Sequence, residues 1–137
     1  MNRSADWLHQ ARADLAQAQA QLAAEAGHHD WASFACHQGA EKALKALHLA
    51  CGQQVWGHGL GRALLDLPDA PRERPVAQVS DLQVRLNVLD ALYIPTRDPE
   101  SFSEGAPTNH FGRLQSQDAL RHARPLVDAI RAALAEA

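Results

Sequence analysis

Residues 31–50 read WASFACHQGAEKALKALHLA, and this stretch decides the fold class because its small and apolar side chains gather on one side of a helical wheel. The residues on that side are Ala35, Cys36, Ala40, Ala43, Leu44 and Leu47. A face made of such small side chains lets a second helix approach closely. We therefore predict a helix of about twenty residues, which Asp30 caps and Gly52 ends.

Apolar residues repeat every three or four positions in several other segments. In residues 4–26 this stripe consists of Trp7, Ala11, Leu15, Ala18 and Leu22. Similar patterns predict helices over residues 60–67, 76–92 and 115–135, whereas the proline-rich PDAPRERP at 68–75 predicts a polar loop. No segment alternates with a period of two, so no sheet is indicated. The prediction is an all-α protein, an antiparallel bundle of four long helices with one extra short helix.

The chain has 137 residues and a formal net charge of −3. This length suits one hydrophobic core, so we expect a single helical domain over residues 1–137. No apolar run approaches the roughly 18 residues that a membrane span needs, and MNRSADWLHQ does not resemble a signal peptide, so the expected location is the cytoplasm. The small negative charge gives no global attraction for nucleic acid, and any such contact would need a local basic patch.

Cys36 and Cys51 fall fifteen residues apart in one predicted helix. At about 1.5 Å per residue they are separated by roughly 22 Å. A disulfide spans at most about 7 Å between Cα atoms. We expect two free thiols that pack in the core.

Opposite the small face of residues 31–50, His37, Glu41, Lys45 and His48 follow one another at helical spacing. They could orient a metal-ligand pair or a phosphate-binding lysine. Alternatively they form an ordinary solvated face with a Glu41–Lys45 ion pair. The zinc pattern HExxH is absent, so no metal and no cofactor are predicted. Lys42 and Lys45 remain candidate phosphate contacts.

The segment GHGLG at residues 57–61 is rich in glycine and precedes the predicted short helix. Its backbone amides, together with His58, could contact a phosphate. It lacks the Gly-Lys-Ser/Thr ending of a Walker loop, and no strand precedes it. A tight turn between two helices explains the same residues.

The segment LDALYIPTRDP at residues 89–99 places Thr96 and Arg97 between two prolines. Each proline disfavours helical angles at the residue before it, so the segment loses little freedom on folding. An arginine held in this way suits the bidentate capture of a phosphate or carboxylate. The alternative is that Asp98 starts a helical turn and that Arg97 pairs with an acid of a neighbouring helix.

The chain resembles the HEPN domain family (higher eukaryotes and prokaryotes nucleotide-binding) in the order of its segments. These segments are WLHQARADLAQA, WASFACHQGAEKALKALHLACGQQVWGH, LDALYIPTRDP and an amphipathic last helix. The similarity covers nearly the whole chain and is closest to the small stand-alone prokaryotic form. AEKALKAL and YIPTR carry it most specifically. It implies an antiparallel bundle of four to five helices, dimerisation through helix faces, and pairing with a minimal nucleotidyltransferase encoded next door.

The resemblance also implies a toxin–antitoxin context, in which some family members are ribonucleases. Those ribonucleases carry an arginine followed four to six residues later by a histidine. In this chain only Arg3 and His9 have that spacing, far from the position the family uses, and His110 follows Arg97 by thirteen residues. Similar proteins commonly carry an aromatic residue after YIPTR, where this chain has Asp98.

Three functions remain open at this stage. The leading hypothesis is a non-catalytic nucleotide-binding or regulatory module that acts with a minimal nucleotidyltransferase partner. The alternatives are a HEPN-type ribonuclease toxin and a homodimeric scaffold without a ligand. The candidate ligand-binding residues are Lys42, Lys45, His58, Tyr93, Thr96 and Arg97, and no catalytic residue is assigned.

Overall fold

The computed structural model describes residues 2–54, 57 and 59–136. Within these ranges all regular structure is helical, which confirms the predicted all-α class. The α-helices are α1 (Ser4–Ala23), α2 (His29–Ala50), α3 (Leu60–Leu65), α4 (Asp69–Gln78), α5 (Leu82–Asp90), α6 (Pro107–His110) and α7 (Arg113–Ala135), and a 3₁₀ helix covers Pro99–Ser101.

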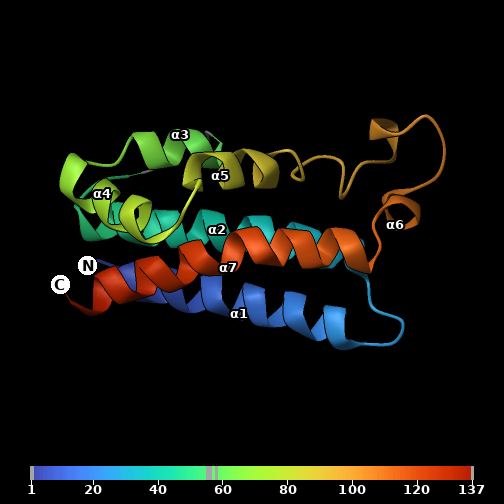
Figure 1. The fold of residues 1–137 in the computed structure, drawn as a ribbon, viewed down its shortest axis with the longest axis horizontal. Coiled ribbons are helices and arrows are strands. Elements are labelled where there is room, and N and C mark those ends of the chain that lie inside the picture. The colour runs from blue at the N-terminus through green and yellow to red at the C-terminus, as the bar shows by residue number, and fades with distance from the viewer. Residues whose placement is uncertain (1, 55–56, 58, 137) are drawn as a thin grey trace.

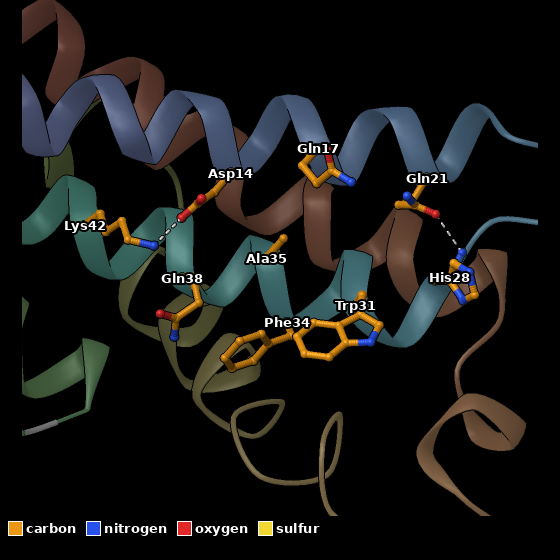
Figure 2. Close-up of a pocket in the computed structure, with 9 residues that line it drawn as sticks. All are labelled: Asp14, Gln17, Gln21, His28, Trp31, Phe34, Ala35, Gln38 and Lys42. Atoms are coloured by element: carbon orange, nitrogen blue, oxygen red, sulfur yellow. Dashed lines mark hydrogen bonds and ion pairs between the residues drawn. The ribbon is translucent and has the colours of Figure 1, made fainter.

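The long helices α1, α2 and α7 pack against one another, and α5 adds a shorter fourth helix against α7 (Figure 1). In Figure 1, α1 and α5 run in one direction along the bundle, and α2 and α7 run in the other. The short helices α3 and α4 lie at one end, beside α5 (Figure 1). Between α1 and α2 a groove stays open along the outside of the bundle (Figure 2).

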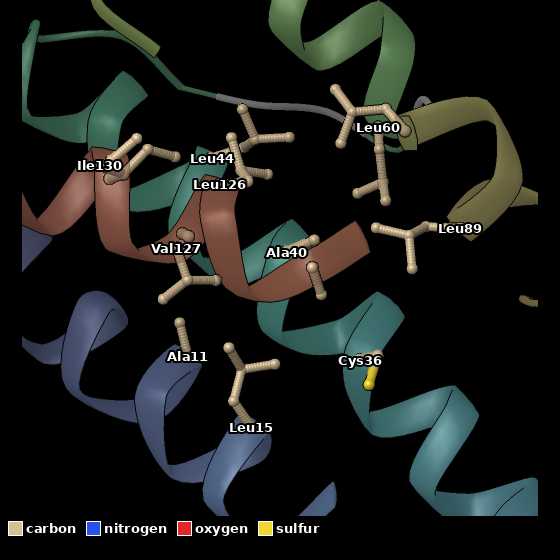
Figure 3. Packing of buried hydrophobic residues seen from close by; sticks show 14 of the residues in the cluster. Ala11, Leu15, Cys36, Ala40, Leu44, Leu60, Leu89, Leu126, Val127 and Ile130 are labelled. Carbon is tan, nitrogen blue, oxygen red and sulfur yellow. The ribbon is translucent and has the colours of Figure 1, made fainter. Parts of the chain in front are cut away.

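The small face of α2 lies in the core, as its composition predicts. Cys36, Ala40 and Leu44 meet side chains of α1 and α7 there, and Leu60 and Leu89 join them from α3 and α5 (Figure 3). Gly39 shows how close α1 comes. A Cβ added there would lie 2.8 Å from Leu15 Cδ2 and 3.2 Å from the backbone oxygen of Ala11. The helices approach closely because this position has no side chain.

The predicted loop at residues 68–75 is wrong, because α4 runs through it from Asp69 to Gln78. Pro71 lies in the first turn, where a backbone N–H has no partner within the helix in any case. The predicted helix over 76–92 is wrong in its first part. The chain breaks before α5 at Asp81, whose φ of 55° is left-handed, a conformation that aspartate tolerates better than most residues.

Three other boundaries differ from the predictions. α1 ends at Ala23 rather than near residue 26, and α7 begins at Arg113. α2 begins at His29, so Asp30 lies buried in its first turn and is not the N-cap. The segment after α5 forms a series of turns, the 3₁₀ helix and α6, none of which the sequence pattern predicted apart from the helical turn at Asp98.

The two cysteines are free and differ in environment. Cys36 is fully buried, and this burial raises the pKa of its thiol to about 12. Cys51 is half-buried at the end of α2, and burial raises the pKa of its thiol as well.

In the part of the chain that the structure describes, no helix combines the length and the apolar character that crossing a bilayer requires.

Candidate functional site

The candidate site lies where α2 faces the turns that follow α5, and Arg97 is at its centre. The Cζ atom of Arg97 lies 4.8 Å from the ring centroid of Phe34 and 4.5 Å from that of Tyr93. Its Nε donates a hydrogen bond to the backbone oxygen of Tyr93 at 3.0 Å. Among the described residues, no hydrogen bond or ion pair involves its two terminal nitrogens. The guanidinium is therefore held at one edge and available at the other.

The turn under Arg97 is fixed by backbone and side-chain hydrogen bonds. The amide of Arg97 donates to the oxygen of Ile94 at 3.0 Å. Thr96 is buried, and its hydroxyl donates to the oxygen of Leu92 at 2.6 Å. Asp98 then caps the 3₁₀ helix by accepting from the amide of Glu100. Thr96 thus supports the turn from below, and Arg97 is the residue that the turn presents.

His37 forms the buried part of the site. Only 4% of the residue is exposed, and its ring centroid lies 5.0 Å from that of Tyr93. Nε2 is 3.4 Å from an oxygen of Asp90, and Nδ1 is 3.2 Å from the side-chain nitrogen of Gln38. Since an amide nitrogen only donates, Nδ1 accepts and the ring proton belongs on Nε2, facing Asp90.

The protonation of His37 follows from this environment. Burial lowers the pKa of the imidazole, while the negative charges of Glu41 and Asp90 oppose that shift and Arg97 adds to it. Desolvation disfavours the charged form of a histidine because the interior solvates an ion poorly. The ring is therefore neutral near pH 7, and it positions Asp90 and Tyr93 without adding positive charge.

Asp90 joins three elements at the end of α5. Its carboxylate accepts hydrogen bonds from the amides of Leu60 at 2.9 Å and Gly61 at 3.3 Å, at the start of α3. These amides of GHGLG, which could have contacted a phosphate, thus already donate to a carboxylate of the chain itself. This favours the interpretation of GHGLG as a turn. His58, also predicted as a ligand contact, lies outside the described residues.

A cavity of about 380 Å³ opens between these elements. Its lining includes His37, Glu41, Asp90 and Tyr93. Two carboxylates and a neutral imidazole give the cavity negative character. An anion is therefore attracted to Arg97 and repelled from the inside of the cavity. No three His, Cys, Asp or Glu side chains within residues 2–54, 57 and 59–136 are grouped so as to hold a metal ion.

The structure does not bring the two predicted lysines to Arg97. Lys42 pairs with Asp14 of α1 at 2.6 Å, and Lys45 lies over the Trp7 ring, 3.9 Å from its centroid. Lys45 is eleven residues from Phe34 along α2, which corresponds to about 16 Å at 1.5 Å per residue. A single phosphate at Arg97 does not reach them. Of the other predicted residues, Thr96 supports the turn from below, and Tyr93, which is 42% exposed, lies beside Arg97 in the site.

Phe34, His37 and Asp90 are site residues that the sequence analysis did not assign. Phe34 and His37 are three residues apart on α2, and Asp90, the last residue of α5, has the same spacing to Tyr93, which is the signal that was available. The interpretation of the α2 stripe as solvated is wrong for two members. His37 is buried, and so is His48, whose Nε2 lies 2.7 Å from the oxygen of Ala63 in α3.

Comparisons with known proteins found one family model and several similar solved structures. The HEPN domain model matches residues 4–133. TT1696 from Thermus thermophilus is 42% identical with a TM-score of 0.83, over 96% of this chain and 98% of that one. ST0689, an archaeal HEPN homologue, is 27% identical with a TM-score of 0.74, over 96% and 98%. The HEPN domain protein tm0613 from Thermotoga maritima shares the fold at 23% identity and a TM-score of 0.65, over 96% and 99%. No curated protein matches the chain significantly.

Proposed function

The chain belongs to the HEPN domain family, and from that premise we propose that it is a non-catalytic module that binds a nucleotide through Arg97 and acts with a minimal nucleotidyltransferase. The observation that carries the nucleotide part is the guanidinium of Arg97, which lies over the neighbouring rings of Phe34 and Tyr93 and is fixed at Nε. Its terminal nitrogens form no hydrogen bond or ion pair with the described residues. In this arrangement an arginine can donate two hydrogen bonds to the oxygens of a phosphate that arrives from outside.

The energetics support a phosphate contact at this position. Hydrogen bonds that involve a charged group contribute roughly 1.5–3 kcal/mol, and a guanidinium can make two of them in parallel. The two rings and the Nε hydrogen bond restrict the side chain before the ligand arrives, which reduces the entropy lost on binding. The loop prolines likewise restrict the backbone of this segment and so reduce the conformational entropy that is lost.

The partner rests on the family resemblance, which implies pairing with a minimal nucleotidyltransferase encoded next door. A nucleotide held at Arg97 would sit on the outside of the bundle, where such a partner can reach it. A small nucleotidyltransferase encoded next to this gene would support the pairing, and its binding can be measured with the two purified proteins. An unrelated neighbouring gene, or no binding between the two proteins, would contradict it.

Calorimetry with a panel of nucleotides tests the Arg97 site. Wild type, Arg97→Gln and Arg97→Lys are compared, with Arg131→Gln on the exposed side of α7 as the matched control. We expect at least a tenfold loss of affinity in Arg97→Gln, an intermediate loss in Arg97→Lys, and none in the control. If Arg97→Gln binds every ligand as the wild type does, or if the wild type binds no nucleotide, the proposed function is wrong.

A further inference from the structure

The groove between α1 and α2 lies directly beside the Arg97 site and has the size of a small-molecule pocket. Its volume is about 410 Å³, within the range of roughly 300–1,000 Å³ that such sites occupy. Trp31, Phe34, Gln38 and Lys42 line it from α2, and Asp14, Gln17 and Gln21 line it from α1 (Figure 2). Figure 2 shows these side chains along one opening, with the aromatic rings at one rim.

Two aromatic rings make the apolar rim of this groove. Trp31 is 59% exposed although it is the largest type of apolar side chain. Its ring meets that of Phe34 edge to face, with centroids 5.8 Å apart and planes at 79°. More than half of the residue stays exposed beside this contact, which leaves indole surface accessible to a ligand. Base–aromatic stacking is a common use of such a face, because every nucleobase has a matching π surface.

The polar groups of the groove are neutral or neutralised. Gln21 accepts a hydrogen bond from the amide of His28 at 2.8 Å, which holds the loop between α1 and α2. Lys42 and Asp14 form an ion pair at 2.6 Å, and both side chains are mostly buried. Gln17 adds an amide that can donate and accept, and Gln38, whose nitrogen already donates to His37 and Glu41, adds an amide oxygen that can accept. The groove therefore suits an uncharged planar ring with hydrogen-bonding edges better than it suits a phosphate.

Phe34 connects the groove to Arg97. The same ring lines the groove and lies 4.8 Å from the guanidinium carbon. A ligand that carries a planar heterocycle and one anionic group on a short linker can thus occupy both places at once. The surroundings also limit the charge of that group. Asp90 and Glu41 line the adjacent cavity together with Tyr93, the ring under Arg97, so each negative charge beyond the one that Arg97 attracts is opposed.

We propose that the α1–α2 groove binds the base of a nucleoside monophosphate, stacked on Trp31, while Arg97 binds its phosphate on the other side of Phe34. Gln17 and Gln38 then contact the polar edge of the base. This inference rests on the proposed nucleotide site at Arg97 and adds to it a base-binding subsite and a preference for a monophosphate over a triphosphate.

The test compares adenosine, guanosine, cytidine and uridine monophosphates with the corresponding triphosphates and with inorganic phosphate, by calorimetry on the full chain. The variants are Trp31→Ala and Trp31→Phe, with Trp7→Phe as a matched control at the far end of the α1–α2 pair. Because Trp31 is exposed, its replacement should leave the thermal unfolding temperature nearly unchanged, and circular dichroism checks this.

We expect Trp31→Ala to weaken monophosphate binding about tenfold, in line with the loss of one stacking contact. Trp31→Phe should retain most of the affinity, Trp7→Phe should retain all of it, and inorganic phosphate should bind all of these proteins equally. Monophosphates should bind more tightly than triphosphates.

Two results separate the two proposals. If Arg97→Gln abolishes nucleotide binding and Trp31→Ala leaves it unchanged, the base subsite is wrong while the Arg97 site stands. If the triphosphate binds more tightly than the monophosphate in the wild type, the charge argument is wrong. If Trp31→Ala weakens binding and Arg97→Gln does not, the groove binds the ligand and the proposed phosphate contact fails.

Discussion

His37 is a neutral imidazole enclosed between Gln38, Asp90 and Tyr93, and its burial makes stability depend on pH. Burial lowers its pKa below the ordinary value of 6.5. The unfolded chain therefore takes up this proton at a higher pH than the folded chain does. The free energy of unfolding is highest above the ordinary pKa and falls as the pH drops through it toward the lower, folded-state pKa.

Lowering the pH from about 7 to 5 should consequently reduce the free energy of unfolding, by at most about 1.4 kcal/mol per pH unit for one group. Urea unfolding of wild type and His37→Gln at several pH values measures this, and the variant should show a shallower dependence. His122 serves as the comparison, because burial lowers its pKa as well. His122→Gln should therefore remove a separate part of the pH dependence of the free energy of unfolding. An unchanged pH slope in His37→Gln would contradict the prediction.

The same enclosure bears on catalysis. We expect ribonuclease activity to be absent or very weak, because the ring nitrogens of His37 face Gln38 and Asp90, and only 4% of the residue is exposed. A general base needs to reach the proton it removes. A fluorescent single-stranded RNA assay checks this. Cleavage by the purified protein that disappears in Arg97→Ala, His37→Gln or His9→Ala would show that the chain is an enzyme.

The sequence allowed part of the site to be predicted at the level of single residues. Arg97 could be singled out as a candidate because flanking prolines restrict the backbone, which is a local effect, and its contact with a ligand stays a prediction. Phe34 and Asp90 could not, because their contacts depend on how α2 and α5 face each other. The lysines of α2 were assigned to a phosphate from their charge and their helical spacing, and the structure gives each a neighbour on α1 instead.

At the scale of elements, Asp90 fixes α3 against the end of α5. A carboxylate that accepts from the first amides of a helix replaces hydrogen bonds the helix cannot make itself, and such a cap contributes about 0.5–2 kcal/mol. We expect Asp90→Ala to lower the free energy of unfolding by about 1–2 kcal/mol, and Asp90→Asn by less, because the amide oxygen still accepts. Chemical denaturation measures both, with Asp66→Ala at the exposed end of α3 as the control. Equal loss in Asp90→Asn and Asp90→Ala would show that the cap is not the cause.

The helix boundaries show which elements the sequence pattern could predict. The long apolar stripes of α1, α2 and α7 specify their helices because each repeats over several turns. α4 was missed because three prolines usually indicate a loop, yet Pro68 precedes the helix, Pro71 lies in its first turn and Pro75 is tolerated inside it. The break at Asp81 was missed because the apolar spacing continues across it, and only the left-handed backbone reveals the turn.

At the scale of the whole molecule, one chain leaves several large apolar side chains at its surface. Trp31, Val84, Ile94 and Leu114 are each more than half exposed. Exposed apolar surface of this kind often marks a contact with another molecule. A symmetric pair of chains would cover part of it, as the family resemblance implies.

We therefore expect a homodimer, with a mass about twice the 14.9 kDa of one chain. Sedimentation velocity at micromolar concentrations measures the mass directly. Val84→Glu and Leu114→Glu, placed on α5 and α7, indicate which face is covered, since a buried charge at the interface should shift the equilibrium to monomer. A wild-type monomer over the whole concentration range would rule out the dimer.

Because the two cysteines differ in burial, the rates at which their thiols react can be used to measure opening of the helical core in the native chain. Alkylation by a maleimide requires an exposed thiolate, and Cys36 offers neither exposure nor ionisation near neutral pH. Cys51 should therefore be labelled first, with Cys36 reacting only when the small face of α2 separates from α1 and α7. The rate at which the second label is incorporated, followed by mass spectrometry, then counts how often the core opens under native conditions.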